Sequence, residues 1–235
     1  MRFPLNRVIF VFLLSATATV ASQSPPSSPS SLKIKKPASQ DSSFDSGTVT
    51  NGVYHNKSLA LSCKIPPGWV LRTDELNARQ KQEEDKQEEE KKSETNVEQK
   101  PEDKPASSSG AKVLLAAFSR PPEARAEDVN SSILIAAESA ASYPGLTEAA
   151  QYFFPLTEVA KSQGFVPDED PYEIAIGTKT LPRADFHKDV GTRVMHQSTL
   201  ALLAHGYAIS ITVIGGTDDE VEDLIDGLSF TSTTK

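Results

Sequence analysis

A run of 34 residues, 77–110, is too polar to belong to a hydrophobic core. It holds ten Asp and Glu, seven Lys and Arg, and one sizeable apolar residue, Val97. A helix needs an apolar stripe to pack against a core, so we predict a disordered, charged insertion, with an exposed helix plausible over 78–92. The core must then be built from the flanking pieces, 50–76 and 111–231, which supply 27 and 121 residues.

The first 21 residues have the features of a secretory signal peptide. Arg2 and Arg7 give a basic start, an unbroken apolar run covers 8–14, and small residues continue to Ala21. The apolar stretch is about 14 residues, shorter than the ~20 that cross a bilayer, so cleavage is favoured over a membrane anchor. We therefore predict that 1–21 is removed and that the mature chain is secreted or periplasmic, with no membrane span.

A second biased segment, 22–49, is rich in Ser and Pro. Its apolar content is too low to offset the entropy of ordering, which predicts a disordered linker. It is either a spacer from a surface or partner, or a tail without a role. The remaining chain, 50–235, is predicted to be a single globular domain interrupted by the insertion at 77–110.

Charge and cysteine content exclude several classes of protein. The net charge of −8 and the pI near 5.1 argue against a general nucleic-acid binder, which needs a basic face. The single cysteine, Cys63, excludes an intramolecular disulfide framework and a cysteine-based zinc site. We expect Cys63 to face the core and to be inert, with pairing to another chain as the alternative.

The apolar pattern predicts mostly strands, with two helical regions. Alternation favours a half-buried strand over 59–65, and His205-Gly206 is typical of a hairpin turn between two long strands. Thr217 to Glu220 forms a capping box before a helix with i, i+3, i+4, i+7 spacing. The other predicted elements are a short edge at 69–71, strands at 112–118, 132–137, 172–178 and 184–187, and a helix after Pro144-Gly145 that is kinked or divided at Pro155. The order of elements predicts an α+β fold with a central antiparallel sheet covered by helices.

Several short motifs, taken in order, resemble those of PsbP-like and Mog-type domains. Gly52-x-Tyr54-x-Asn56 precedes a strand that closes with Ile65-Pro66-Pro67-Gly68-Trp69. Further similar motifs are Pro144-Gly145-Leu146 with Tyr152, Ile176-Gly177 with Pro182 to Phe186, Gly206 to Ile209, and Leu228-Ser229-Phe230. The resemblance implies a PsbP/Mog-like sandwich. It implies no shared activity, because members include a photosystem II extrinsic subunit and a Ran-binding protein, neither of which is an enzyme.

One cluster has residue types suited to metal chemistry. On an extended strand Asp185, His187 and Asp189 share a face, and two carboxylates with an imidazole can bind a divalent metal. The alternative, which we favour, is a polar solvent face with Phe186 directed inward. Lys188 adds positive charge to this stretch and disfavours a cation there.

Three other features allow a functional and a structural interpretation. His196 and Ser198 share a strand face, but no G-x-S-x-G motif accompanies them. Gly215-Gly216-Thr217 precedes a helix and favours simple capping, because the acidic residues that follow would repel an anion. Trp69 either anchors a partner or covers the edge of the sheet.

These observations favour an exported, non-enzymatic binding or accessory domain without a cofactor. We assign no catalytic, cofactor-binding or metal-binding residue, and the expected partner is an envelope protein or ligand that the sequence does not identify. One alternative is a metal-dependent, hydrolase-type enzyme that uses Asp185, His187 and Asp189. The other is a structural cell-surface protein tethered by 22–49.

Overall fold

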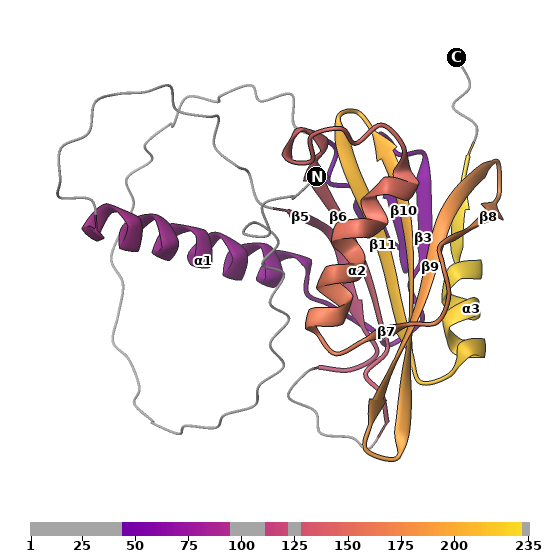
Figure 1. Cartoon of the computed structure of the whole chain (residues 1–235). Coiled ribbons are helices and arrows are strands. Elements are labelled where there is room, and N and C mark those ends of the chain that lie inside the picture. Colours follow the sequence, from indigo (N-terminus) through magenta and orange to yellow (C-terminus); the bar gives the residue numbers. More distant parts are fainter. Residues whose placement is uncertain (1–43, 95–110, 122–127, 232–235) are drawn as a thin grey trace, which may run out of the picture.

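The computed structural model describes residues 44–94, 111–121 and 128–231 (Figure 1). The helices are α1 (Thr73–Glu94), α2 (Phe153–Ser162) and α3 (Asp218–Asp226), with short 3-10 helices η1 (Ala140–Ser142) and η2 (Ala149–Tyr152). The strands are β1 (Thr48–Thr50), β2 (Val53–Asn56), β3 (Leu61–Lys64), β4 (Val70–Leu71), β5 (Lys112–Phe118), β6 (Ser132–Ser139), β7 (Val166–Pro167), β8 (Tyr172–Ile176), β9 (Lys179–Val190), β10 (Arg193–Ala204), β11 (Tyr207–Gly215) and β12 (Leu228–Phe230). None of the helices in these ranges is long and apolar enough to cross a membrane.

The strands form two antiparallel sheets. The larger sheet has the order β4-β5-β6-β11-β10-β9-β7, with β8 also paired to β9, and the smaller sheet has the order β1-β2-β3-β12. The larger sheet is built on long hairpins, since β9 and β10 have 12 residues each. The predicted hairpin turn at His205-Gly206 is confirmed, and both residues have the positive φ of a tight two-residue turn, 53° and 79°.

Apolar side chains form two clusters, one on each face of the larger sheet. The first fills the space between this sheet, the smaller sheet and α3, and includes Leu61, Ile211 and Leu224. The second lies beneath η2 and α2, and includes Phe153 and Phe186. The long hairpins therefore contribute apolar side chains to both faces.

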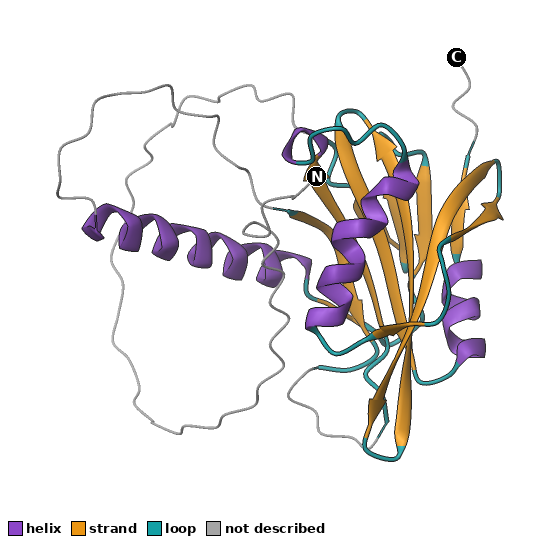
Figure 2. Cartoon of the chain, in the orientation of Figure 1, coloured by secondary structure: helices purple, strands orange, loops and turns teal. Residues whose placement is uncertain are grey.

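The predicted fold class, α+β with a central sheet covered by helices as in a PsbP/Mog-like sandwich, is wrong. The chain is rich in strands (Figure 2), and a second sheet, rather than helices alone, covers one face of the larger sheet. Helices α2 and α3 have only 10 and 9 residues, and α1 projects away from both sheets (Figure 1). The sequence did not predict the smaller sheet, because β1 and β12 have three residues each, too few to show a period of two. In addition, β12 pairs with β3, although the two strands lie near opposite ends of the domain's sequence.

The segments around the predicted insertion and linker contain ordered structure. Helix α1 starts before the predicted insertion, and Asn77 exchanges hydrogen bonds of 2.9 and 3.0 Å with the backbone of Val113 in β5. Phe44, inside the predicted linker, is buried and stacks on Tyr207 with ring centroids 4.6 Å apart. The signal peptide, most of the linker and residues 95–110 lie outside the described residues, so their predicted states stay predictions.

Local signals explain the two short helices. Pro155 occupies the third position of α2, within its first turn, where helices tolerate proline. The chain makes a 3-10 turn in η2 and then an α-helix, so two short helices are found, but the division lies between Tyr152 and Phe153 and not at Pro155, which is inside α2. Helix α3 begins at the predicted cap, where Thr217 Oγ1 accepts a hydrogen bond of 3.1 Å from the N–H of Glu220.

Candidate functional site

The three residues proposed as metal ligands share a strand but do not converge. Both carboxylate oxygens of Asp185 are engaged, one by Arg183 Nε at 2.8 Å and the other by the Tyr172 hydroxyl at 2.5 Å. His187 is paired through Nδ1 with Asp168, whereas Asp189 is exposed near the end of β9. Within the described ranges, no group of three or more His, Cys, Asp or Glu side chains is arranged to hold a metal ion.

Arg183 is the centre of this region, and the sequence interpretation did not single it out. Its guanidinium forms ion pairs with Asp185 and, at 2.5 Å, with Glu222 of α3, and it lies over the ring of Tyr172. Burial lowers the pKa of Arg183, but the hydrogen bonds to Glu222 and Asp185 outweigh burial and raise it above its usual value. Arg183 therefore stays charged. We refer to Arg183, Asp185, Tyr172 and Glu222 together as the arginine cluster.

The arginine cluster is a closed set of interactions. Burial, followed by the hydrogen bond donated to Asp185, raises the pKa of Tyr172 to about 12, so its hydroxyl stays protonated near neutral pH. A cavity of about 250 Å³ lies beside the cluster. Because the charged groups of the cluster already satisfy one another, this geometry is that of a structural network between β9 and α3.

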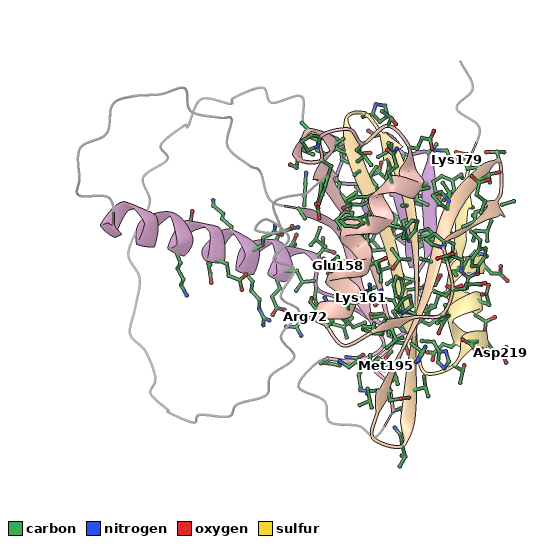
Figure 3. All side chains as sticks on the ribbon, viewed as in Figure 1. Arg72, Glu158, Lys161, Lys179, Met195 and Asp219 are labelled. Carbon is green, nitrogen blue, oxygen red and sulfur yellow. The ribbon has the colours of Figure 1, made fainter. Side chains whose placement is uncertain are left out.

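His196 and Ser198 do not form a nucleophile and base. His196 Nδ1 lies 2.6 Å from a carboxylate oxygen of Asp218 in the first turn of α3, the turn that also contains Asp219, labelled in Figure 3. Ser198 is fully buried, and its hydroxyl has no hydrogen-bond partner among the described residues. The shared strand face predicted from the sequence therefore brings no proton acceptor to the serine hydroxyl.

The start of α3 and the cysteine both have structural roles. Glu220 accepts hydrogen bonds from the N–H of Gly216 at 2.8 Å and from the Ser131 hydroxyl at 2.6 Å, so its carboxylate occupies the helix N-terminus. This confirms capping at Gly215-Gly216-Thr217. Cys63 is confirmed as a core residue with no exposed surface, and burial raises the pKa of its thiol to about 12.

A second hollow, which was not predicted, lies where both sheets end. Strand β1 is the edge of the smaller sheet and β4 is an edge of the larger one, and an open groove of about 860 Å³ separates them. Eight apolar residues line it: Val49, Val53, Ile65, Pro66, Pro67, Trp69, Leu71 and Leu224. We call this hollow the edge groove.

Backbone turns set the two walls of the edge groove. The Asn51-Gly52 turn joins β1 to β2 with φ values of 52° and 75°, and the carbonyl of Gly52 accepts a 2.8 Å hydrogen bond from the N–H of Ile65. The Pro-Pro-Gly loop turns at Gly68, whose φ of 85° favours glycine. The only part of the edge groove that the sequence indicated was this loop with Trp69. For Trp69 the sequence left two roles open, binding a partner or covering the edge of the sheet. Trp69 in fact packs against the core and also lines the groove.

The edge groove combines exposed apolar side chains with a charged rim. Val49 and Leu71 expose 38% and 47% of their surface, although the residues opposite them on the paired strands, Tyr54 and Ala117, are buried. Asp223 and Asp226, on the last turns of α3, line the rim and are exposed, and Lys64 contributes one positive charge. The groove thus has an apolar floor and a mainly acidic mouth.

Comparisons with known proteins identify no family. No protein-family model matches the chain, and no curated protein matches it in sequence. Among solved structures, LpqN of Mycobacterium tuberculosis, described as involved in cell envelope biogenesis, aligns at 13% identity over 72% of this chain and 82% of its own, with a TM-score of 0.35. A protein of unknown function from Pseudomonas aeruginosa aligns at 17% identity over 43% of this chain and 68% of its own, with a TM-score of 0.31.

A third solved structure, from Bacteroides thetaiotaomicron, aligns at 12% identity over 74% of this chain and 46% of its own, with a TM-score of 0.34. Similarities of this size do not define a common fold. The resemblance to PsbP-like domains is not matched by a family model, and the functional argument below depends on the geometry of this chain.

Proposed function

We propose that the protein is an exported, non-enzymatic accessory domain that binds a component of the cell envelope through the edge groove. The observation that carries this proposal is the apolar groove between the edges of two sheets, with exposed Val49 and Leu71 on its two sides. Its volume of about 860 Å³ is within the range that ligand-binding clefts occupy.

The edges on either side of the groove favour an extended polypeptide as the bound segment. No described strand pairs with the outer edge of β1 or of β4, so each edge has free hydrogen-bonding positions. A peptide strand can add to such an edge while alternate side chains enter the groove. Complete burial of one Leu or Val side chain contributes about 1.5–3 kcal/mol, so a few contacts of this kind support a specific complex.

The sequence supports the export and accessory parts of the proposal. Residues 1–21 have the basic, apolar and small-residue parts of a signal peptide, and a Ser- and Pro-rich linker follows them. The motifs that resemble PsbP-like domains, in which non-enzymatic subunits occur, favour a binding role over catalysis. The arginine cluster is compatible with that role, because its charged groups bind one another.

The test starts from the purified mature chain, 22–235. It is immobilised and exposed to a detergent extract of the envelope of its source cells, and recovered proteins are identified by mass spectrometry. Each candidate is then purified, and its affinity for the chain is measured by calorimetry. We expect Leu71→Asp to weaken binding at least about tenfold, because a carboxylate enters an apolar contact, and Val166→Asp to leave it unchanged.

Val166 is a matched control, since it is exposed at 52% on β7, at the opposite edge of the larger sheet. Equal affinity of the Leu71→Asp and wild-type chains for every reconstituted partner would overturn the proposal. Failure to reconstitute any complex from the extract would count against it as well.

A further inference from the structure

The edge groove combines an unpaired strand edge with the acidic end of a helix. We propose that the partner binds as an extended segment added to β1, with an apolar and a basic residue two positions apart on the face turned into the groove. The inference rests on the proposed function, because it takes the edge groove as the binding site. It goes further by specifying the strand that the partner extends and the pattern of side chains that the groove selects.

Strand β1 has backbone groups that point to its open edge. The carbonyl of Gly52 accepts a hydrogen bond from the N–H of Ile65, so the backbone of Gly52 is directed toward β3. Because these directions alternate along a chain in a sheet, the backbone of Val53 is directed toward β1, where it pairs with Thr50. The N–H and C=O of Val49, next to Thr50, therefore point away from β2, to the edge that no described strand covers.

A segment that pairs with Val49 directs a side chain into the groove. Residues directly opposite each other on paired strands have their side chains on the same face of the sheet. The side chain of Val49 lines the groove, and Trp69 and Leu71 line it from the larger sheet. An apolar side chain opposite Val49 therefore covers apolar surface that the free protein exposes.

The end of α3 adds two carboxylates that have no cation. Asp223 and Asp226 are exposed and line the groove. Within the described chain, α3 forms ion pairs through Asp218 and Glu222, and through neither of these two residues. Both lie in the last turn, which has no basic residue, and the C-terminal end of a helix carries a partial negative charge. This position is unfavourable for carboxylates in the free protein and favourable for a cation supplied by a partner.

The shared groove determines the spacing of the two side chains. Since the apolar wall and the carboxylates line one hollow, the apolar and basic residues must lie on the same face of the segment, two positions and about 7 Å apart. Lys64 is the one cation among the described lining residues, so the balance of charge is negative. Arginine suits this end best, because its guanidinium has five donors in a fork that matches carboxylates.

Charge disfavours two other occupants of the groove. A second copy of the chain, whose net charge is −8, would bring its own acidic rim to this one. A ligand that carries phosphate would also meet Asp223 and Asp226. Because like charges at close range repel, the groove favours a basic segment of a different protein.

Peptide binding to the mature chain, 22–235, tests the pattern. The first peptide has seven residues with blocked ends, a central valine, arginine two positions to either side and threonine elsewhere, so it can bind in either direction. Its isomer has both arginines next to the valine, and a third peptide has glutamate in place of arginine. We expect calorimetry to show at least about tenfold tighter binding of the first peptide, because only this peptide has valine and arginine on one face.

Equal affinity of the three peptides would overturn the proposal, and so would the absence of binding by all of them. Self-association of the mature chain that Leu71→Asp abolishes, measured by sedimentation, would also overturn it and would assign the groove to a second copy.

Charge reversal tests the contact with α3. The variant Asp223→Lys/Asp226→Lys should bind the arginine peptide at least about tenfold more weakly and the glutamate peptide more tightly than wild type. The control Asp170→Lys/Glu173→Lys changes the net charge equally at exposed residues outside the groove and should keep the wild-type affinity within about twofold. Equal losses in the two variants would show attraction by overall charge and would overturn the proposal.

The same variant has a readout in the free protein. Lysines suit the C-terminal end of a helix, so the thermal midpoint of Asp223→Lys/Asp226→Lys should equal or exceed that of wild type. A lower midpoint would show that the two carboxylates support the fold, and would overturn their assignment to a partner.

Methylated peptides test the addition to β1. A valine opposite Val49 would exchange hydrogen bonds with it, so methyl groups on the valine and arginine amides should weaken binding at least about tenfold. Methyl groups on the threonine amides between them point to the other edge of the segment and should have little effect. Equal binding of both methylated forms and the parent peptide would overturn strand addition.

The two proposals can fail separately. If a reconstituted partner depends on Leu71 but peptide binding depends neither on the spacing nor on the rim, the edge groove has another specificity and only this inference falls. If the peptides bind as expected but no reconstituted partner depends on Leu71, the proposed function falls.

Discussion

The arginine cluster and the edge groove differ in how far their groups satisfy one another. In the cluster, the guanidinium of Arg183, both oxygens of Asp185 and the hydroxyl of Tyr172 all have partners within the chain. In the groove, Val49 and Leu71 are exposed, and no described strand pairs with the outer edge of β1. The charged groups of the cluster are thus paired with one another, whereas the apolar side chains of the groove remain exposed.

The largest expected effect is the loss of stability when the arginine cluster is broken. Arg183→Ala leaves Asp185 partly buried without its cation, and we expect the free energy of unfolding to fall by about 3 kcal/mol. Urea denaturation of the mature chain measures this change. Arg79→Ala is the control, because its ion pair with Glu75 is exposed and should contribute less than about 1 kcal/mol. Equal effects of the two substitutions would show that the cluster is not a structural network.

The groove should behave in the opposite way. Leu71→Asp should change the free energy of unfolding by less than about 1 kcal/mol, because the side chain is 47% exposed. The same substitution should weaken binding of a reconstituted partner at least about tenfold, or 1.4 kcal/mol. Leu61→Ala is the internal standard for a buried leucine, at about 2–5 kcal/mol of stability. A loss of stability at Leu71 close to that at Leu61 would make the groove part of the core.

A third region extends the comparison, because the carboxylate of Glu138 accepts a hydrogen bond from the Tyr143 hydroxyl and forms no salt bridge with a cation among the described residues. Burial raises the pKa of Glu138, although hydrogen bonds from Tyr143 and Tyr152 oppose this shift. Since the folded-state pKa is the higher one, protonation of Glu138 stabilises the fold below the unfolded pKa, and this contribution disappears as pH rises through the folded pKa. We therefore expect Glu138→Gln, which mimics the protonated form, to be most favourable relative to wild type near pH 7 and to lose this advantage toward pH 4.

Thermal unfolding of both chains across this pH range is the measurement. The difference between their midpoints isolates Glu138 from the other carboxyl groups, which titrate alike in the two chains. A difference that is constant with pH, or that grows toward acid, would contradict the raised pKa.

The smallest effect is expected where the chain has few contacts with either sheet. Helix α1 is held to β5 at Asn77, whereas the sequence of 82–109 contains no large apolar residue except Val97. Replacement of 82–109 by a flexible linker of about ten residues should change the thermal midpoint by less than about 2 °C, because loop length costs little closure entropy. A larger fall would show that the insertion supports the core.

Local features of the fold were predictable, because neighbouring residues define them. The hairpin at His205-Gly206, the cap at Thr217, the edge at 69–71 and the buried Cys63 all follow from period, turn chemistry or capping within a few residues. The cover of the larger sheet was not predictable in this way. It depends on β12 pairing with β3, where Leu228 lies opposite Cys63, and strands of three or four residues do not reveal such a partner.

For the candidate sites, too, the sequence revealed local relations but not contacts between distant segments. The sequence placed Asp185 and His187 on one face, which the strand period alone determines. It did not reveal that Arg183 and Tyr172 bind Asp185, or that Asp168 binds His187, because these partners come from other strands and loops. The edge groove was equally hidden, since its walls come from β1, the Pro-Pro-Gly loop and the end of α3.

The sequence by itself determined most strands of the larger sheet, the turn at His205-Gly206 and the cap at Thr217, because backbone preferences and apolar periods operate over a few residues. Only the tertiary structure decided that two sheets rather than helices enclose the main core, and that their edges leave an apolar groove. The physical reason is that burial and charge pairing depend on which distant segments meet, and free energy from such contacts is distributed over the whole fold.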